Sequence, residues 1–114
     1  MGLTEAAGAV LFAPINQATA AANEIVAAVA ERKIRILGVV LSNNDATNPV
    51  VATLQDDAGS PKKILGPIRL AAGQTVVIPA SGLGYGETNV GEALNLLLGS
   101  AITVGGSITY QLVR

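Results

Sequence analysis

The residues of this chain that could perform chemistry are a few carboxylates. Glu87 and Glu92, together with Asp56 and Asp57, are the candidates for the paired acids of a glycoside hydrolase. Their spacing does not pair an acid with a base, and no nucleophile, base and orienting group can be assembled. Histidine and cysteine are absent from all 114 residues, which removes the commonest general base and the thiolate nucleophile. We therefore predict a protein without enzymatic activity.

A glycine-rich run over residues 82–86, with the sequence GLGYG, comes closest to a phosphate-binding loop. It lacks the spacing of the two common phosphate-binding motifs, and no helix is expected after it. We interpret the run as a loop. Tyr85 at its centre is predicted to be an exposed contact residue, because tyrosine is enriched in protein interfaces.

Two short runs of asparagine and aspartate could supply oxygen ligands to calcium. They are residues 43–45 (NND) and residues 56–57 (DD). Neither run has the spacing of an EF-hand loop, and Asn and Asp side chains in turns commonly hydrogen-bond their own backbone. We predict turns at both places, with no bound metal and no cofactor.

The net charge of −1 argues against nucleic acid as a partner, because nucleic-acid binding needs a basic face. The basic clusters at residues 32–35 and 62–63 are short, and only two Tyr and one Phe could stack on bases. Residues 93–113 carry no charge and are long enough to cross a bilayer. Polar residues interrupt this stretch and its apolar residues alternate, so we predict no membrane partner either.

The chain has few charged residues for its size. They make up 13% of the sequence, against a usual value of about 25%. A single domain of 114 residues with so little charge must expose apolar patches, and such patches usually mark contact sites. The composition therefore favours a homo-oligomer or a member of a larger assembly.

The elements that would position these residues are mostly short strands separated by turn residues. The clearest strand is residues 33–42 (KIRILGVVLS), which is apolar on both faces of its pleat. Further strands are predicted at residues 50–56, 63–70, 75–79, 93–98, 101–104 and 107–113, with a turn at 105–106. About eight short strands at this spacing indicate an all-β fold, a sandwich or a jelly roll.

Two segments near the N-terminus allow more than one interpretation. Residues 18–32 have helix-forming composition, yet a strand over 24–29 followed by a turn at 30–32 fits as well. Residues 1–22 are apolar without a core-forming period, and Pro14 blocks a continuous helix. They are either a strand over about 9–13 followed by a loop, or an arm that lies on another protein surface. We take residues 1–22 as an arm and residues 23–114 as the sandwich domain.

From residue 23 onward the chain resembles a family of small structural proteins of tailed bacteriophages, which includes capsid decoration (cement) proteins. The stretches that carry the resemblance are residues 25–30 (IVAAVA), 33–41 (KIRILGVVL), 65–70 (LGPIRL), 91–96 (GEALNL) and 105–110 (GGSITY). In that family the first two stretches form strand, turn and strand, which favours the strand over the helix at 24–29. The family commonly has glycine at the turn, where this chain has Ala30, Glu31 and Arg32.

The resemblance implies a jelly-roll-like β-sandwich that decorates the outside of a virion capsid. Its expected partners are further copies of itself, as a homotrimer, and the major capsid protein; the chain would be made in the host cytoplasm. The alternatives are a tail, baseplate or fibre component, or a carbohydrate- or receptor-binding sandwich, for which Tyr85 and residues 87–89 are the nearest candidates. The residues expected to dock on the capsid or on a neighbouring copy are Leu3, Val10, Leu11, Phe12 and Ile15, with Tyr85 as a loop contact.

Overall fold

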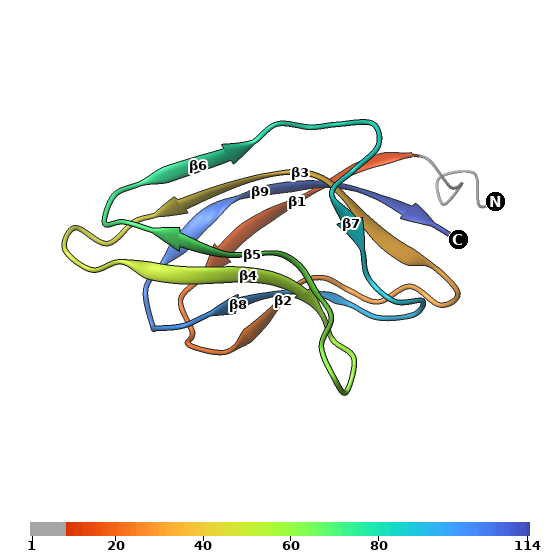
Figure 1. Cartoon of the computed structure of the whole chain (residues 1–114), viewed down its shortest axis with the longest axis horizontal. Coiled ribbons are helices and arrows are strands. Elements are labelled where there is room, and N and C mark those ends of the chain that lie inside the picture. Colours follow the sequence, from red (N-terminus) through yellow and green to blue (C-terminus); the bar gives the residue numbers. More distant parts are fainter. Residues whose placement is uncertain (1–8) are drawn as a thin grey trace.

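The computed structural model describes residues 9–114, and in this range the chain has nine β-strands and no helix (Figure 1). The strands are β1 (Val10–Gln17), β2 (Ala22–Val26), β3 (Lys33–Asn43), β4 (Val50–Asp56), β5 (Lys63–Leu70), β6 (Thr75–Ile78), β7 (Gly86–Glu87), β8 (Leu94–Leu98) and β9 (Val104–Val113). The predicted all-β fold is confirmed. Across residues 9–114 there is no helix long and apolar enough to cross a membrane.

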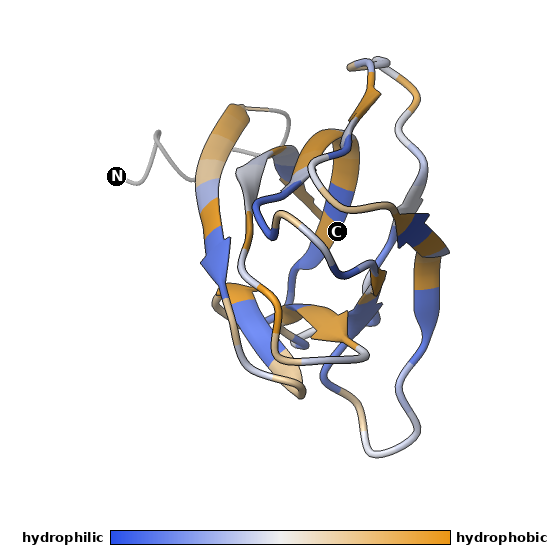
Figure 2. Ribbon diagram, turned by 90° about the vertical axis from the view of Figure 1, so that its left-hand side faces the viewer, coloured by the Kyte–Doolittle hydropathy of each residue, from blue (hydrophilic) through white to orange (hydrophobic). Residues whose placement is uncertain are grey.

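The strands form two antiparallel sheets. The first sheet has the order β1-β9-β3-β6, with β7 also paired to β3, and the second has the order β2-β8-β4-β5. Most strands that follow one another in the chain lie in different sheets, so the connections cross from one layer to the other. Figure 2 looks along the longest axis and shows the strands arranged around a common interior. The predicted β-sandwich is therefore present, while the jelly-roll-like connectivity stays a prediction.

The interior between the sheets is filled by side chains from alternate strand positions, as the two-residue period of a strand requires. Removing their apolar surface from water stabilises the fold by about 25 cal/mol per Å². The fully buried members include Ile34, Ile36 and Leu41 of β3, Leu54 of β4, Leu94, Leu96 and Leu98 of β8, and Ile108 of β9.

β3 differs from the sequence-based expectation of a strand that is apolar on both faces. A register shift between Ile36 and Gly38 places an extra residue, Leu37, in the strand. Such a bulge moves every later residue to the opposite face. Val39 therefore faces the interior, on the side of Ile34 and Ile36, and β3 buries one apolar face rather than presenting two.

The ambiguous segment 18–32 contains a strand and no helix. β2 covers residues 22–26, slightly before the predicted range of 24–29, and pairs with β8 in the second sheet. The turn that follows closes with a 3.1 Å hydrogen bond from the Arg32 amide to the Val29 carbonyl. Since β3 belongs to the first sheet, this turn carries the chain between the layers and does not form a hairpin.

The predicted N-terminal arm is corrected over residues 10–17, which form β1 and pair with β9 along the whole strand. Ile15 is a core residue with 3% exposure, so it cannot dock on a partner. The period of two was hidden by alanines and by Pro14. This proline is tolerated because β1 is an edge strand. The alternative of a first strand near 9–13 is therefore the better interpretation; Leu3 lies outside the described residues.

The turn predicted at residues 105–106 is also corrected, because both glycines lie inside β9. Gly106 is paired with β1 on one side and β3 on the other, opposite Ile15 and Leu41. A side chain at Gly106 would overlap the Val40 carbonyl group. Glycine is needed here for close approach of the backbones rather than for a change of direction.

Candidate interaction surfaces

The outer face of the first sheet gathers two of the predicted docking residues. Directly opposed residues of antiparallel strands share a face, so the pairings define rows that cross the sheet. Ile15 of β1 and Ile108 of β9 point inward. The residues that alternate with them along each strand therefore point outward, among them Phe12, Pro14, Ser107 and Thr109. The three central rows are Phe12, Thr109 and Gly38; Pro14, Ser107, Val40 and Val77; and Asn16, Gly105, Ser42 and Thr75.

These three rows contain no charged residue, and two of them end in a large exposed apolar side chain. Phe12 is 73% exposed on β1, and Val77 is 62% exposed on β6, at the opposite edge of the sheet. Val10 extends the surface along β1 and is also exposed. Between the two edges the side chains are small. We call this surface the apolar face; the sequence did not predict Val77 as part of it.

Tyr85 lies in the connection between β6 and β7, on the opposite edge of the first sheet from Phe12, so the structure does not bring these two residues together. Its side chain is partly exposed, and its hydroxyl donates a 2.7 Å hydrogen bond to the Pro79 carbonyl. Its amide donates to the Ile36 carbonyl at 2.8 Å. These bonds hold the loop against β3, and they leave Leu83, with 89% exposure, at its tip.

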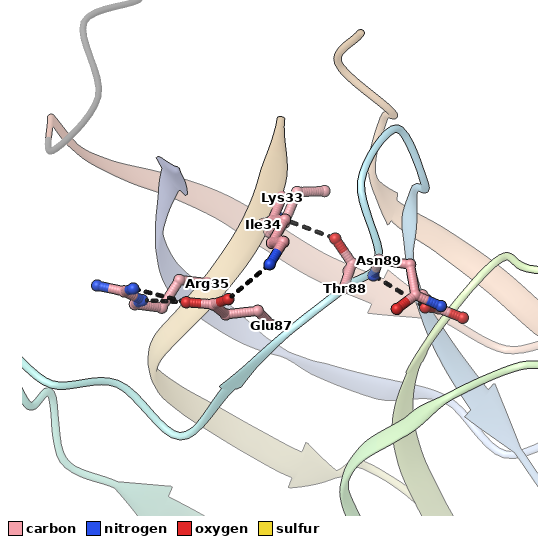
Figure 3. Close-up of polar contacts among 7 residues, drawn as sticks. Lys33, Ile34, Arg35, Glu87, Thr88 and Asn89 are labelled. Carbon is pink, nitrogen blue, oxygen red and sulfur yellow. Dashed lines mark hydrogen bonds and ion pairs between the residues drawn. The ribbon is translucent and has the colours of Figure 1, made fainter. Parts of the chain in front are cut away.

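A cluster of charged and polar groups joins β7 to β3 at one end of the first sheet (Figure 3). Glu87 accepts a 2.7 Å hydrogen bond from Arg35 Nε, and its carboxylate also lies 3.8 Å from Lys33 Nζ. The buried Thr88 hydroxyl accepts from the Ile34 amide at 2.9 Å. The candidate acid Glu87 is therefore committed to two cations. Its role in this arrangement is to fasten the edge segment to the sheet.

Asp56 of β4 continues the same connection into the second sheet, where it accepts a hydrogen bond from the amide of Asn89. It is fully buried, and its carboxylate accepts hydrogen bonds from the amides of Asn89 at 3.0 Å, Lys62 at 2.9 Å and Ala58 at 3.2 Å. Burial by itself would raise the pKa of this carboxyl. The three backbone hydrogen bonds and the nearby Lys62 charge together outweigh burial and hold the pKa of Asp56 below its ordinary value.

The Asn/Asp run at residues 43–45 forms the turn that the sequence predicted. Asn43 is buried, accepts a hydrogen bond from the Asp45 amide at 2.8 Å and donates to the Asn48 and Leu70 carbonyls. Asp45 accepts from the amides of Thr47 and Asn48, and these bonds lower its pKa. Among residues 9–114, no three acidic side chains gather in a way that could hold a metal ion.

Of the residues predicted to form contacts, Val10 and Phe12 point outward, Leu11 is half-buried on the inward side, and Ile15 is in the core. Leu83 and Val77 were missed. An exposed Leu in a glycine loop and the outward position of Val77 in a four-residue strand carry no distinctive sequence signal.

Comparison with known proteins gives no further information on the chain: no family model, curated protein or solved structure matches it.

Proposed function

We propose that this chain is a virion structural protein, a decoration protein of a tailed bacteriophage that binds across adjacent major capsid subunits and stabilises the head. The proposal is supported by the resemblance described above and by the apolar face. The single observation that carries it is the exposure of Phe12 and Val77 at the two edges of a sheet face without charge in its central rows. Exposed apolar surface of this kind marks a contact site in a soluble domain.

In this proposal the apolar face lies on the capsid surface. Phe12 acts as the anchor, because aromatic side chains dominate the energetics of most interfaces. A decoration protein that spans a boundary between capsid subunits adds buried area on both sides of it. The area lost when the subunits separate is then larger, so the shell resists heat and osmotic stress.

The chain is proposed to act as a homotrimer at the capsid surface of the virion, after synthesis in the host cytoplasm. Leu83 lies in the loop on the edge of the sheet away from Phe12. The apolar face can therefore contact the shell while the Leu83 loop contacts a neighbouring copy. The Leu83 loop is suited to the second role because hydrogen bonds of Tyr85 hold it in place.

The test is co-sedimentation of the purified chain with heads assembled from the major capsid protein of the same genome. We expect the wild-type chain to sediment with the heads and to raise their melting temperature. The double variant Phe12→Ser/Val77→Thr should lose at least tenfold in affinity. The matched control is Val90→Thr, because Val90 is 53% exposed but belongs to the connection after β7 and not to the apolar face.

Each outcome of this experiment has a definite consequence. Equal binding by the wild type and the double variant would exclude the apolar face as the docking surface. Binding to purified tails and not to heads would replace the proposal with a tail, baseplate or fibre component. Binding to neither particle would overturn a virion role.

A further inference from the structure

A row of polar residues crosses the outer face of the second sheet from edge to edge. Glu24 of β2 is paired with Asn95 of β8, Asn95 with Gln55 of β4, and Gln55 with Lys63 of β5. The neighbouring positions of the central strands, Leu54 and the residues on either side of Asn95, are buried in the core. Since successive residues of a strand point to opposite sides, the row lies on the outer face.

The central residues of this face are unusual because they are buried and polar without matching partners. Gln55 is 6% exposed and Thr53, in the next row, is 4% exposed. Neither the Gln55 amide nor the Thr53 hydroxyl has a hydrogen-bond partner in the part of the chain that the structure describes, and neither is sealed from solvent. Because their polar atoms still reach solvent, water can bind them in the free chain, and a ligand hydroxyl can replace that water.

Asn95 completes the centre of the row and is also more than nine-tenths buried. Its amide nitrogen donates a 2.9 Å hydrogen bond to Asp57 Oδ1, which fixes the orientation of the side chain. The amide oxygen accepts no hydrogen bond from the described residues. Asn95 thus offers an acceptor oxygen, and Gln55 offers both a donor and an acceptor. The two residues lie opposite each other on neighbouring strands, which are about 4.8 Å apart.

Apolar groups and a shallow pocket continue the same face along β4. Leu97 is half-buried and lies opposite Thr53, and Val51 precedes Thr53 by two positions in β4. Val51 is paired with Arg69 of β5. The pocket is open to solvent and is lined by Pro49, Val50, Val51, Arg69, Gly99 and Ser100. The face therefore combines unpaired hydrogen-bonding groups with an adjacent apolar floor.

We propose that this face binds a neutral saccharide. The neighbouring hydroxyls of a sugar both donate and accept hydrogen bonds, and so do the unpaired groups of Gln55 and Thr53. The apolar C–H face of the sugar ring can lie on Leu97 and Val51. Glu24 and Lys63 stand at opposite ends of the row with opposite charges, so the row itself has no net charge that would favour an ionised ligand.

An extended peptide fits this face less well than a saccharide. Peptides that bind to sheets commonly add a strand at an edge and use backbone hydrogen bonds. The groups in question lie on the central strands β8 and β4, whose backbones are already paired on both sides. Recognition here must use side chains, and saccharides are recognised in that way.

The residues that the sequence suggested for a saccharide site are engaged elsewhere. The Tyr85 hydroxyl donates to the Pro79 carbonyl, Glu87 is paired with Arg35, and the Asn89 amide donates to Asp56. The site proposed here uses the second sheet and not the first. Saccharide binding does not depend on capsid binding, and both can occur on one copy when the second sheet faces away from the shell.

The test is binding of the labelled chain to an array of defined neutral and acidic oligosaccharides and to a peptide array of the same format. We expect binding to a subset of the neutral oligosaccharides. Gln55→Met and Thr53→Val keep the size of each side chain and remove its hydrogen-bonding groups, so each should weaken that binding at least tenfold. Val77→Thr, on the apolar face, is the matched control and should bind as the wild type does.

Folding of the variants is checked by thermal melting, and no loss is expected because neither side chain has a partner to lose. Titration of the ¹⁵N-labelled chain with the best neutral oligosaccharide should shift the signals of Thr53, Gln55 and Asn95. The proposal is overturned by the absence of neutral oligosaccharide binding, by variants that bind as tightly as the wild type, or by binding to peptides alone.

Discussion

Asp56 fixes the end of β4 with a single buried carboxylate. It collects three backbone amides from two different loops, one in the β4–β5 hairpin and one after β7. The ionised form accepts all three hydrogen bonds, and hydrogen bonds to a charged group are stronger than those between neutral groups. The sequence offers Asp56 as a candidate catalytic or calcium-binding acid. Its environment instead gives it a structural role, that of holding the two sheets together at one end.

The pH dependence of stability tests this role. The pKa of Asp56 is lower in the folded chain than in the unfolded chain, where it is about 3.9. Its contribution to the unfolding free energy is therefore complete above pH 4 and is lost as the pH falls through the folded value. Asp56→Asn should lower the unfolding free energy by about 1–3 kcal/mol at pH 7 and by less at pH 2. Urea denaturation at both pH values measures the difference; a cost as large at pH 2 as at pH 7 would contradict it.

Among residues 9–114, Glu31 is the one non-glycine residue with a positive φ angle, which is 64°. A side chain in this left-handed region costs about 1–2 kcal/mol, whereas glycine adopts it freely. Glu31 therefore occupies a turn position that glycine would adopt without this cost.

We expect Glu31→Gly to stabilise the chain by up to about 1 kcal/mol, because relief of the left-handed conformation exceeds the greater entropy loss of glycine. Thermal or urea denaturation gives the value. The matched control is Ala30→Gly, one residue earlier, where φ is not positive and only the entropy loss applies. A lower stability for both variants would show that the turn does not strain Glu31.

At the scale of the element, one bulge in β3 changes which side chains of the strand face the core. Leu37 is the extra residue, and after it the strand turns Val39 and Leu41 toward the core. Gly38 follows the bulge and lies against the connection after β6. A methyl group at Gly38 would be 2.9 Å from the Ala80 Cα and 3.0 Å from the Ile78 carbonyl oxygen. The absence of a side chain allows the connection to lie across the strand.

Gly38→Ala should therefore displace the connection between β6 and β7 and lower the unfolding free energy by about 1–3 kcal/mol, the usual cost of overpacking. The neighbouring atoms are backbone atoms, which cannot move aside as a flexible side chain could. Gly59→Ala in the β4–β5 hairpin is the matched control, because nothing lies near that position. Equal stability of the two variants would show that the connection can shift without cost.

At the scale of the whole molecule, the two sheets offer outer faces of different chemistry. The apolar face of the first sheet has no charge in its central rows, while the second sheet carries unpaired amide and hydroxyl groups. The edges of the sandwich are also unequal. β1 carries Pro14 and β5 carries Pro67, which limit strand addition there, so association is expected through faces and loops.

The proposed trimer makes a prediction at this scale. The wild-type chain should sediment with three times the mass of one chain, and Leu83→Ser should shift it toward the monomer, because an 89% exposed leucine becomes buried in the contact. Val90→Ser is the matched control, since Val90 is also exposed but outside the loop. Sedimentation velocity measures the masses. A wild-type monomer, or a Leu83→Ser trimer of undiminished stability, would rule out this contact.

The sequence by itself was enough to predict the all-β sandwich and most of its strands. Alternating apolar residues, β-branched side chains and turn residues act over a few neighbouring positions, so β4, β5 and β6 and the turn after Asn43 could be located without a structure. The strand at residues 22–26 needed the resemblance as well, because local helix propensity opposed it.

Only the tertiary structure decided which faces these strands present. The bulge at Leu37, the membership of β1 in the first sheet and the position of Gly106 inside β9 all depend on pairing between distant residues. The same holds for the candidate sites: Phe12 and Val77 share a face, and Gln55 lies beside Asn95, only because their strands are brought together in register. Strand propensity is local, whereas register and burial result from packing the whole chain. This is why Glu87 and Asp56, which the sequence offers as candidate acids, tie β7 and the β4–β5 hairpin in place, while the unpaired polar groups lie on the second sheet.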